Sequence, residues 1–411
     1  MIKFTEGDLT FSGQRASQLA KEYGTPLYVY DMMTLRGNID AIRKAIPYAP
    51  LSLHFACMAN NNIFLLREMR RVGVGVFACT PTELIVAGRA GFCGKEVVFT
   101  GSSLSDSEVA TVAEAHVTVN ADSSWQIEGF RRSGGLTSIG IRVTPELESH
   151  TVTLNGSIGA NSRMGILESD VPVLVRAAES RGIVINGTHM YVGTNIMDFE
   201  TFKKPFDRLV HISRGLTGLE YVDIGGGFGV PVCSENMQFN WGAFGSFLSK
   251  EMSALSRSLG KSIELKLEPG RAIIASAGVL LTRVTDVKCR RDRVFVGTDT
   301  SLSNFARPYV YQEFHAVELA DDSLSRNTNE NVTICGNTAA ANDVFARYDL
   351  FPSLRVGDLL AIRNAGAYGM SMSSHFCGRL RPAEVAVDEN SVTLIRRRES
   401  EDGFLCGQVL G

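Results

Sequence analysis

The fold of this chain is decided by a stretch that begins Tyr221-Val-Asp-Ile-Gly-Gly-Gly-Phe-Gly229. Its apolar start predicts a short buried strand, and its glycines predict a tight turn directly after that strand. The apolar residues of Phe244–Leu259 recur at helical spacing, and a second apolar strand follows at Ile263–Leu267. A strand, a turn, a helix and another strand in this order are typical of a βαβ unit with parallel strands.

The same alternation extends back toward the N-terminus. Short apolar runs rich in β-branched residues alternate with amphipathic stretches such as Met33–Ile46 and Ile63–Val72. We therefore expect residues 27–270 to form a (βα)8 barrel of the TIM type rather than an open sheet. The strands expected here are Leu27–Tyr30, Leu51–Cys57, Val74–Cys79, Glu96–Thr100, Val117–Asn120, Ile139–Val143, Ile185–Tyr191, Tyr221–Ile224 and Ile263–Leu267.

After residue 270 the pattern changes to strands without long helices between them. This pattern predicts an all-β domain over residues 271–411. Residues 1–26 are expected to join that domain, with one further strand within Ile2–Phe11. The strands expected in the β domain are Val279–Val287, Arg293–Thr298, Asn331–Cys335, Asp358–Ile362 and Ala383–Ile395.

The length and charge of the chain narrow its function. Its 411 residues are too many for one ordinary core, and 44% of them are hydrophobic while 21% are charged. The formal net charge is only -3, which provides no basic surface for nucleic acid. We therefore expect a globular protein of two or three domains whose partner is a small molecule.

The cysteines and the apolar runs indicate the cellular compartment of the protein. Its eight cysteines are scattered, without the close pairs of a zinc site or the density of a disulfide scaffold, so we expect free thiols and no metal. No run approaches the roughly 18 apolar residues of a membrane-spanning helix, and no basic segment leads into an apolar one at the N-terminus. These features predict a cytoplasmic protein without a membrane partner.

Three motifs follow expected strands, where the functional residues of a barrel lie. Asp223–Gly229 could bring backbone N–H groups close to a phosphate, or could form a plain tight turn. Glu268-Pro-Gly-Arg271 places a carboxylate and a guanidinium at one turn, where they could serve a ligand or pair with each other. Gly366-Ala-Tyr-Gly369 could present a tyrosine hydroxyl to a ligand or pack within a turn.

Taken together, in this order and at these separations, the three motifs resemble the fold-type III pyridoxal-phosphate decarboxylases, the group of diaminopimelate and ornithine decarboxylases. The family fold is an alanine-racemase-like barrel followed by a β domain, which is the architecture expected above. The resemblance covers nearly the whole chain, through further segments at Leu27-Tyr-Val-Tyr-Asp31, Ser162-Arg-Met-Gly-Ile166, Ala306-Arg-Pro-Tyr-Val-Tyr311 and Arg381-Pro-Ala-Glu384 after Ser373-Ser374.

The resemblance implies a site for pyridoxal 5'-phosphate and an amino-acid substrate. Glu268 matches the glutamate that faces the pyridine nitrogen, and a carboxylate there keeps the nitrogen protonated, so that the ring accepts electrons. Arg271, Arg307 and Tyr311 match residues that contact the substrate, and a guanidinium suits a carboxylate. The residues that would hold the phosphate are Gly227, Gly229, Gly270, Arg271 and Tyr368.

The chain departs from the family at the position of the cofactor lysine. The family motif consists of an aromatic residue, Ala, any residue, Lys, Ala and Asn, whereas this chain has Phe55-Ala-Cys-Met-Ala-Asn60. Met58 therefore stands at the lysine position. Methionine cannot form an imine with the cofactor or transfer a proton, so the usual chemistry lacks its central group.

Two further positions differ. The segment His189-Met-Tyr-Val-Gly-Thr194 has Tyr191 in place of the histidine that stacks on the cofactor ring, and an aromatic face there can still stack. In the family a loop gives a cysteine, and in diaminopimelate decarboxylases an adjacent glutamate, to the active site of the partner subunit. In this chain the loop corresponds to Gly336–Asp343, with Ala339 at the cysteine position and Ala340 at the glutamate position. We therefore expect a homodimer whose substrate is an amino acid other than diaminopimelate.

Three accounts of Met58 stay open at this point. It could be an introduced substitution, a natural loss that leaves a non-catalytic binding homologue, or a sign of chemistry that does not need the lysine. The leading prediction is an amino-acid decarboxylase-like lyase that lacks its catalytic lysine in this chain. The alternative is a homologue that binds a cofactor or ligand without releasing CO2.

Overall fold

The computed structural model describes residues 1–134, 136–147, 159, 161–231, 238–321, 326, 328–389 and 391–409. The contacts divide the chain into two compact units. One, here called the barrel unit, comprises Ile39–Pro231 with Asn236–Ala272, and the other, the β unit, comprises Met1–Asn38 with Ile273–Gly411.

Eight parallel strands form the barrel, and the sheet closes because the last strand pairs with the first. β13 pairs with β5 in the register Leu267 to Leu53, and β9 pairs with both β8 and β11. The (βα)8 barrel predicted from the sequence is thereby confirmed. The strands are β5 (Leu51–Ala56), β6 (Gly75–Ala78), β7 (Val97–Phe99), β8 (Thr118–Ala121), β9 (Ser138–Thr144), β11 (Val184–His189), β12 (Tyr221–Asp223) and β13 (Glu264–Leu267), with the short β10 (Ile166–Leu167) beside β9.

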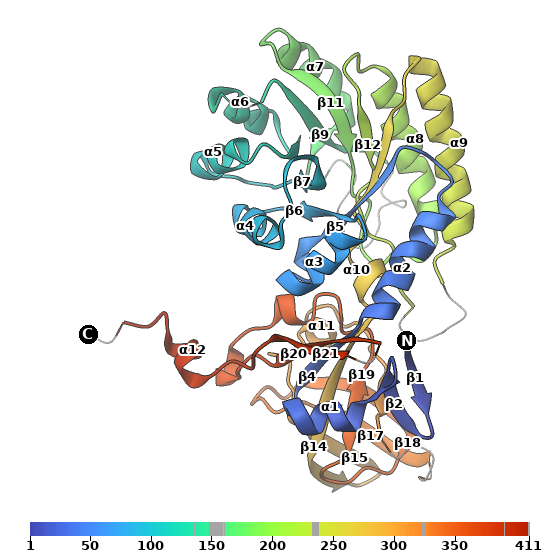
Figure 1. Ribbon diagram of the computed structural model, residues 1–411, viewed down its shortest axis with the longest axis vertical. Helices are drawn as coiled ribbons and strands as arrows, with labels where there is room; N and C mark the ends of the chain where they lie inside the picture. Colours follow the sequence, from blue (N-terminus) through green and yellow to red (C-terminus); the bar gives the residue numbers. More distant parts are fainter. Residues whose placement is uncertain are drawn as a thin grey trace. The chain divides into compact units, whose positions relative to one another are not determined.

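Helices lie around the outside of these strands, as Figure 1 shows. Apolar residues recur every three or four positions along each helix and form one apolar face, which is buried against the barrel. In α9, for example, Phe244, Leu248, Met252 and Leu255 are buried. The helices are α2 (Met32–Ala45), α3 (Ile63–Arg71), α4 (Pro81–Ala90), α5 (Asp106–Glu114), α6 (Ser124–Arg132), α7 (Val171–Glu179), α8 (Glu200–Arg214) and α9 (Trp241–Leu259).

An aromatic cluster fixes the turn that follows β12. The ring of Phe228 lies 5.2 Å from the ring of Phe202 in α8 and 4.8 Å from that of Trp241 in α9, measured between centroids. Phe228 is 1% exposed, and burial of such a side chain contributes about 1.5 to 3 kcal/mol. The glycine turn is therefore anchored to α8 and α9 through Phe228.

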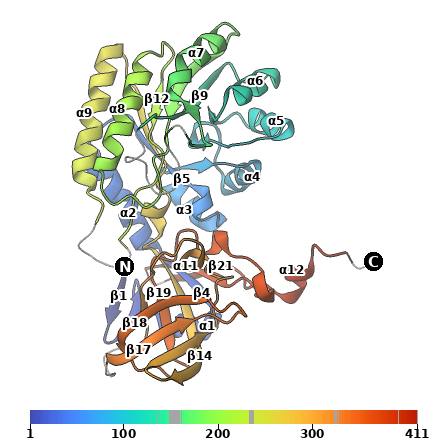
Figure 2. The same ribbon diagram turned by 180° about the vertical axis from the view of Figure 1, so that it is seen from behind.

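The β unit contains a sheet in the order β18-β17-β15-β14-β4-β20-β21, with β19 pairing β14 and β16. Its strands β14, β17 and β18 can be followed in Figure 2. A small N-terminal sheet packs its Leu9 and Phe11 into the same core as Val279 and Leu281. The elements are β1 (Ile2–Thr5), β2 (Asp8–Phe11), β3 (Gln14–Arg15), α1 (Ala16–Tyr23), β4 (Leu27–Asp31), β14 (Gly278–Arg290), β15 (Arg293–Thr298), α11 (Arg307–Val310), β16 (Val317–Leu319), β17 (Thr328–Cys335), β18 (Val344–Pro352), β19 (Leu359–Ile362), β20 (Ala383–Asp388), β21 (Ser391–Arg396) and α12 (Glu401–Leu405). The short α10 (Arg271–Ile274) contains the boundary between the two units.

The structure corrects one strand of the predicted barrel. Leu27–Tyr30 was expected to begin the barrel, but β4 pairs antiparallel with β14 and parallel with β20 in the β unit. All five residues of β4 are buried, and an apolar run buried on both faces does not reveal in which sheet its neighbours lie. The expectation that Leu27 opens the barrel is therefore wrong, and the first barrel strand is β5.

Two further strand predictions were too simple. Ala383–Ile395 was expected as one strand, but β20 and β21 form an antiparallel hairpin that turns after Asp388. Likewise Ile2–Phe11 contains two strands, β1 and β2, which pair in the register Thr5 to Asp8. In both cases polar residues of the segment, at Glu6-Gly7 and after Asp388, form a turn that divides it into two strands.

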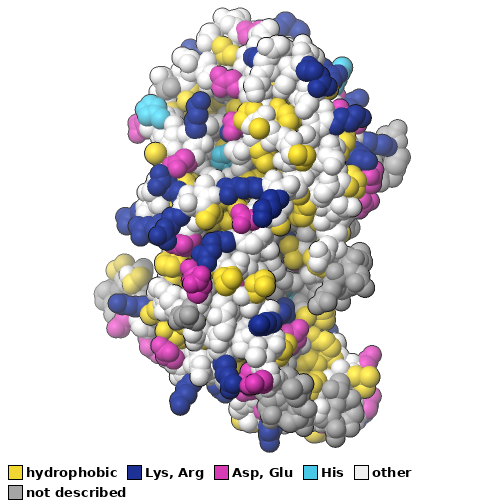
Figure 3. Space-filling model, turned by 45° about the vertical axis from the view of Figure 1, so that its right-hand side comes forward, with side chains coloured by type: hydrophobic (Ala, Val, Ile, Leu, Met, Phe, Trp, Pro, Cys, Tyr) yellow, Lys and Arg dark blue, Asp and Glu magenta, His cyan; other side chains and the backbone are white. Residues whose placement is uncertain are grey.

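The cysteines and the surface agree with a globular chain. Seven of the eight cysteines are free, and Cys233 lies outside the described residues. On the face drawn in Figure 3, lysine and arginine side chains are interspersed with aspartate and glutamate. Among the helices of the described residues, none is long and apolar enough to cross a membrane.

Candidate functional site

Three neighbouring strands bring a buried polar cluster to the carboxyl end of the barrel. His189 and Asp223 are the last residues of β11 and β12, which pair in register, and Glu268 follows β13 directly. Their ligand atoms all lie within 4.8 Å of one another, and each side chain is at most 3% exposed. Nε2 of His189 lies 3.2 Å from Oε2 of Glu268. We call these three residues the strand-end cluster.

Burial controls the charge of this cluster. It raises the pKa of Asp223 to about 8, and repulsion from Glu268 adds to the shift. The pKa of Glu268 also rises to about 8 through burial, against the opposing effects of its hydrogen bond with Asp223 and of the Arg142 charge. Two carboxyl groups this close hold at least one proton between them near neutral pH. Since burial lowers the pKa of His189 to about 4, its imidazole is neutral at pH 7.

The glycine turn Gly225–Gly229 lies beside the cluster. The N–H of Gly225 donates to Oδ1 of Asp223 over 2.9 Å. A side chain on Gly227 would place its Cβ 2.0 Å from the carbonyl oxygen of Gly193, and its φ of 95° is strained for any other residue. Within the described residues the N–H groups of Gly226 and Gly227 donate to no acceptor, so the turn can offer bare backbone donors to an anion.

Gly229 differs from its neighbours in the turn. Its N–H donates to the carbonyl oxygen of Ile196 over 2.9 Å, while Ile196 donates to Gly227 over the same distance. The N–H of Gly229, expected from the sequence to help hold a phosphate, is thus already engaged. Its close packing, with a hypothetical Cβ only 2.3 Å from the sulfur of Met197, explains why glycine is needed there.

Tyr191 lies next to the glycine turn. A Cβ added to Gly227 would be 3.7 Å from Cε2 of the Tyr191 ring. The Tyr191 hydroxyl lies 2.7 Å from Oγ1 of Thr194, which fixes the ring orientation. Burial raises the pKa of Tyr191, against the lowering effects of Thr194, Arg271 and Arg142, so the phenol is neutral at pH 7. The residue therefore presents an aromatic face beside the candidate phosphate donors.

One charged pair of the site was missed in the sequence. Arg142 lies within β9, is 8% exposed, and has NH1 3.6 Å from Oδ1 of Asp122. Asp122 also accepts hydrogen bonds from Ser102 and from the backbone of Gly165. The cation lowers the pKa values of both His189 and Glu268. An arginine inside the apolar strand predicted at residues 139–143 was the signal that could have identified it.

The remaining predicted barrel residues lie at neighbouring strand ends. Arg271, only 7% exposed, begins α10 directly after Gly270 and three residues after Glu268. Met58 is half-buried in the short 3-10 turn Cys57–Ala59 that follows β5. Since β5 is the strand beside β13, the turn carrying Met58 belongs to the same end of the barrel as Glu268.

In the β unit the structure brings three predicted residues together. The guanidinium carbon of Arg307 lies 5.1 Å from the ring centre of Tyr311 and 5.2 Å from that of Tyr368. Arg307 is 2% exposed and also forms an ion pair with Glu313. These distances suit cation–π contacts, which hold the guanidinium in place.

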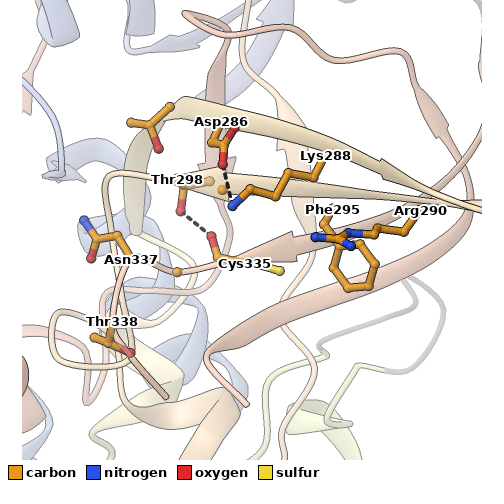
Figure 4. A pocket seen from close by; sticks show the side chains of 11 residues that line it. Asp286, Lys288, Arg290, Phe295, Thr298, Cys335, Asn337 and Thr338 are labelled. Carbon is orange, nitrogen blue, oxygen red and sulfur yellow. Dashed lines mark hydrogen bonds and ion pairs between the residues drawn. The ribbon is translucent and has the colours of Figure 1, made fainter. Parts of the chain in front are cut away.

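The loop with Ala339 is anchored by Asp343, which accepts hydrogen bonds from Leu302 and Thr338. Ala339 and Ala341 are exposed at its tip. The start of the loop borders a pocket of about 690 Å³, shown in Figure 4, where Lys288 pairs with Asp286 at 2.7 Å. Cys335 of this pocket has its pKa raised by burial, so it remains a thiol. The pocket contains no cluster comparable to that of the barrel among its lining residues.

Comparisons with known proteins agree with this geometry. Residues 33–275 match the family described as pyridoxal-dependent decarboxylases, in its pyridoxal binding domain. The diaminopimelate decarboxylase of Methanothermobacter thermautotrophicus is 35% identical, over 98% of this chain and 96% of that protein. That of Archaeoglobus fulgidus is 32% identical, over 97% and 96%.

Solved structures show the same fold along the whole chain. The diaminopimelate decarboxylase of M. jannaschii in complex with L-lysine gives a TM-score of 0.92 at 25% identity, over 100% of this chain and 98% of that one. A structure from Aquifex aeolicus gives 0.85 at 27% identity, over 98% and 96%. The chain therefore belongs to the family of pyridoxal-dependent decarboxylases.

Proposed function

We propose that the barrel unit binds pyridoxal 5'-phosphate between the strand-end cluster and the glycine turn. One observation supports this most directly: a buried pair of carboxyl groups and bare backbone donors occur at adjacent strand ends. The cluster suits a protonated ring nitrogen, and the donors of Gly226 and Gly227 suit a phosphate. A metal ion could also fit the cluster, but a metal site would not explain the bare N–H donors of the adjacent glycine turn.

Different residues of the barrel would contact different parts of this cofactor. Glu268, with Asp223, would keep the proton on the ring nitrogen, and His189 would orient Glu268 through its hydrogen bond. Tyr191 would pack against the ring. When bound, the cofactor supplies an electron sink for the charge left on the α-carbon as CO2 departs.

We further propose that the ancestral reaction of this site is decarboxylation of an α-amino acid, a carbon–carbon lyase reaction. The names of the relatives support the reaction class. Met58 provides no amine or proton-transfer group, so the chain as given is expected to be inactive or very slow. The roles of Arg307, Tyr311 and Tyr368 toward substrate and phosphate, and of Gly270 and Arg271 toward the phosphate, stay predictions.

The substrate is proposed to differ from the diaminopimelate named for the relatives. Diaminopimelate carries an ammonium and a carboxylate at its far end, and removing both from water without partners costs several kcal/mol. The tip Ala339-Ala340-Ala341 offers no charged side chain to that end. We also propose a homodimer in which this loop reaches the site of the partner subunit, as the resemblance implies.

The test is to restore the amine with Met58→Lys and to measure CO2 release from ornithine, lysine, arginine, diaminopimelate and apolar amino acids. Turnover of one of them by the variant, and none by the unmodified chain, would support the proposal. A variant that binds the cofactor but releases no CO2 from any amino acid would favour the alternative, a non-catalytic homologue. Sedimentation at low protein concentration tests the dimer, because a monomer with full cofactor affinity would contradict shared sites.

A further inference from the structure

The barrel lacks a lysine at the carboxyl ends of its strands. The chain has ten lysines, and all of them lie in the described residues. Nine are at least partly exposed, and those of the barrel unit lie in helices or at the amino ends of strands. These six are Lys44 in α2, Lys203 and Lys204 in α8, Lys250 in α9, Lys95 before β7 and Lys261 before β13.

Lys266, the one buried lysine, is turned away from the candidate site. Its Nζ lies 2.8 Å from Oε2 of Glu264, two residues nearer the amino end of β13, and 5.3 Å from the ring centre of Tyr221. Residues that begin four strands line a pocket of about 430 Å³ together with Lys266: Thr118, Ser138, Tyr221 and Glu264. The amine is therefore directed to the opposite end of the barrel from Glu268.

Removing Lys266 from this environment would be unfavourable. The side chain is only 4% exposed, and its ammonium is paired within the barrel. Breaking the pair would leave the buried ammonium without its carboxylate partner. Lys266 is thus held in place and cannot substitute for a lysine at position 58.

On this basis, and resting on the proposed cofactor function, we infer that the site binds its cofactor as a ready-made amine adduct with an amino acid. It does not bind the cofactor as a free aldehyde that then forms a covalent bond with an amine of the protein. The contacts offered by the strand-end cluster and the glycine turn are the same for both forms. At the aldehyde end, however, the half-buried Met58 offers only a thioether and two methylenes. The amino-acid part of an adduct adds buried surface there, and no protein amine competes with it.

A small buried apolar area is enough to make the adduct bind more tightly than the aldehyde. A tenfold difference in Kd corresponds to about 1.4 kcal/mol, which burial of roughly 55 Å² of apolar surface provides. Burial of an α-carbon and one side-chain carbon, at about 0.8 kcal/mol each, is of this size. We therefore expect at least about a tenfold preference for the adduct over the aldehyde.

The experiment compares three ligands: pyridoxal 5'-phosphate, pyridoxamine 5'-phosphate and the reduced adduct N-phosphopyridoxyl-L-alanine. Binding is followed by tryptophan fluorescence, because Trp241 packs against Phe228 of the glycine turn. In the unmodified chain and in the matched apolar variant Met58→Leu, the adduct is expected to bind at least about tenfold more tightly than the aldehyde. In Met58→Lys the aldehyde is expected to be retained through gel filtration and to shift its absorbance, which reverses the preference.

Equal or tighter binding of the aldehyde by the unmodified chain would overturn the inference. The same holds if borohydride treatment and peptide mass spectrometry find the cofactor on any of the ten lysines. If Met58→Lys retains the aldehyde while the unmodified chain ignores the adduct, the inference fails and the proposed function stands. If none of the three ligands binds to either protein, the proposed function itself is wrong.

Discussion

Nε2 of His189 and Oε2 of Glu268 lie 3.2 Å apart in a part of the barrel that is closed to water. In the described residues Nδ1 of His189 has no hydrogen-bond partner, so Nε2 makes the bond of the ring, either as donor to the carboxylate or as acceptor from the protonated Glu268. In either case the neutral histidine fixes the orientation of Glu268 without adding a charge of its own. The carboxyl pair of Glu268 and Asp223 is then left to ionise beside a cationic ligand atom.

The first prediction concerns Glu268→Gln. The variant keeps the shape of the side chain but removes the charge that would hold a protonated ring nitrogen. Loss of a hydrogen bond to a charged group costs about 1.5 to 3 kcal/mol, so the Kd for N-phosphopyridoxyl-L-alanine should rise roughly 10- to 100-fold. Fluorescence titration measures it, with Glu220→Gln at the other end of the barrel as the control.

The folding stability of Glu268→Gln separates this role from a structural one. The variant removes one of two buried carboxyl groups that repel each other, so its melting temperature without ligand should equal or exceed that of the unmodified chain. A variant that loses ligand affinity only because it unfolds would show a lower melting temperature instead.

The second prediction concerns stability against pH without ligand. The folded pKa values of Asp223 and Glu268, about 8, lie above their unfolded values near 4, so the folded state holds a proton that the unfolded state has lost. Stability must then fall as the pH rises through this range. The pKa of His189 is lowered to about 4, and its effect is confined to pH values below about 6.5.

Between pH 6.5 and 8 the carboxyl pair therefore acts without His189. Each proton retained by the folded state corresponds to a loss of about 1.4 kcal/mol per pH unit. Denaturant unfolding across this range should show a steeper slope in the unmodified chain than in Glu268→Gln, which keeps only the buried carboxyl group of Asp223. Equal slopes in the two proteins would show that Glu268 does not retain a proton in the folded state.

The third prediction tests the glycine turn with Gly227→Ala. Its added Cβ would lie 2.0 Å from the backbone of Gly193, so the turn must move, and the chain should lose more than about 2 kcal/mol of stability together with its ligand affinity. Gly182→Ala is the matched control: that glycine also has a positive φ, 78°, but nothing lies within 4 Å of its added Cβ. It should lose only about 1 kcal/mol and keep its affinity.

The fourth prediction separates the ring of Tyr191 from its hydroxyl. Tyr191→Phe keeps the aromatic face and loses the bond with Thr194, so the Kd should change less than about threefold. Tyr191→Ala removes the face, and aromatic packing worth about 0.5 to 1.5 kcal/mol beyond its area predicts a rise of tenfold or more. Equal effects of the two variants would mean that the hydroxyl, and not the ring, contacts the ligand.

Much of the fold could be predicted from the sequence because the spacing of apolar residues differs between strands and helices. The eight barrel strands and α9 follow such local patterns. The misplacement of β4 has a different origin. Whether Leu27 pairs with β14 or with a barrel strand depends on partners more than 250 residues away, about which a local pattern carries no information.

Only part of the candidate site could be predicted from the sequence, for a related reason. Glu268 and the glycine turn could be found because turn chemistry marks strand ends. The raised pKa values of Asp223 and Glu268 depend on their separation and burial, and the engagement of the Gly229 N–H depends on Ile196 in another loop. Arg142 was missed because its partner Asp122 follows a neighbouring strand, β8, and neither residue belongs to a glycine motif.

The last prediction concerns the far end of the substrate. If the loop Gly336–Asp343 reaches the site of a partner subunit, a carboxylate at position 340 should meet the distal ammonium of diaminopimelate, whereas the present Ala340 cannot. Starting from Met58→Lys, the additional change Ala340→Glu should raise kcat/KM for diaminopimelate by roughly 10- to 100-fold, as a charge-assisted hydrogen bond of about 1.5 to 3 kcal/mol allows. Turnover of an apolar amino acid should stay the same or fall.

Ala340→Gln in the same background is the matched control, because its amide has a similar length without the charge, and it should gain much less. Efficient turnover of diaminopimelate by Met58→Lys alone would contradict the proposed substrate difference, since an uncharged loop tip would then suffice. Equal gains from the glutamate and glutamine variants would show that length and not charge decides. Both outcomes can be read independently of folding, because Asp343, which anchors the loop through Leu302 and Thr338, is left unchanged.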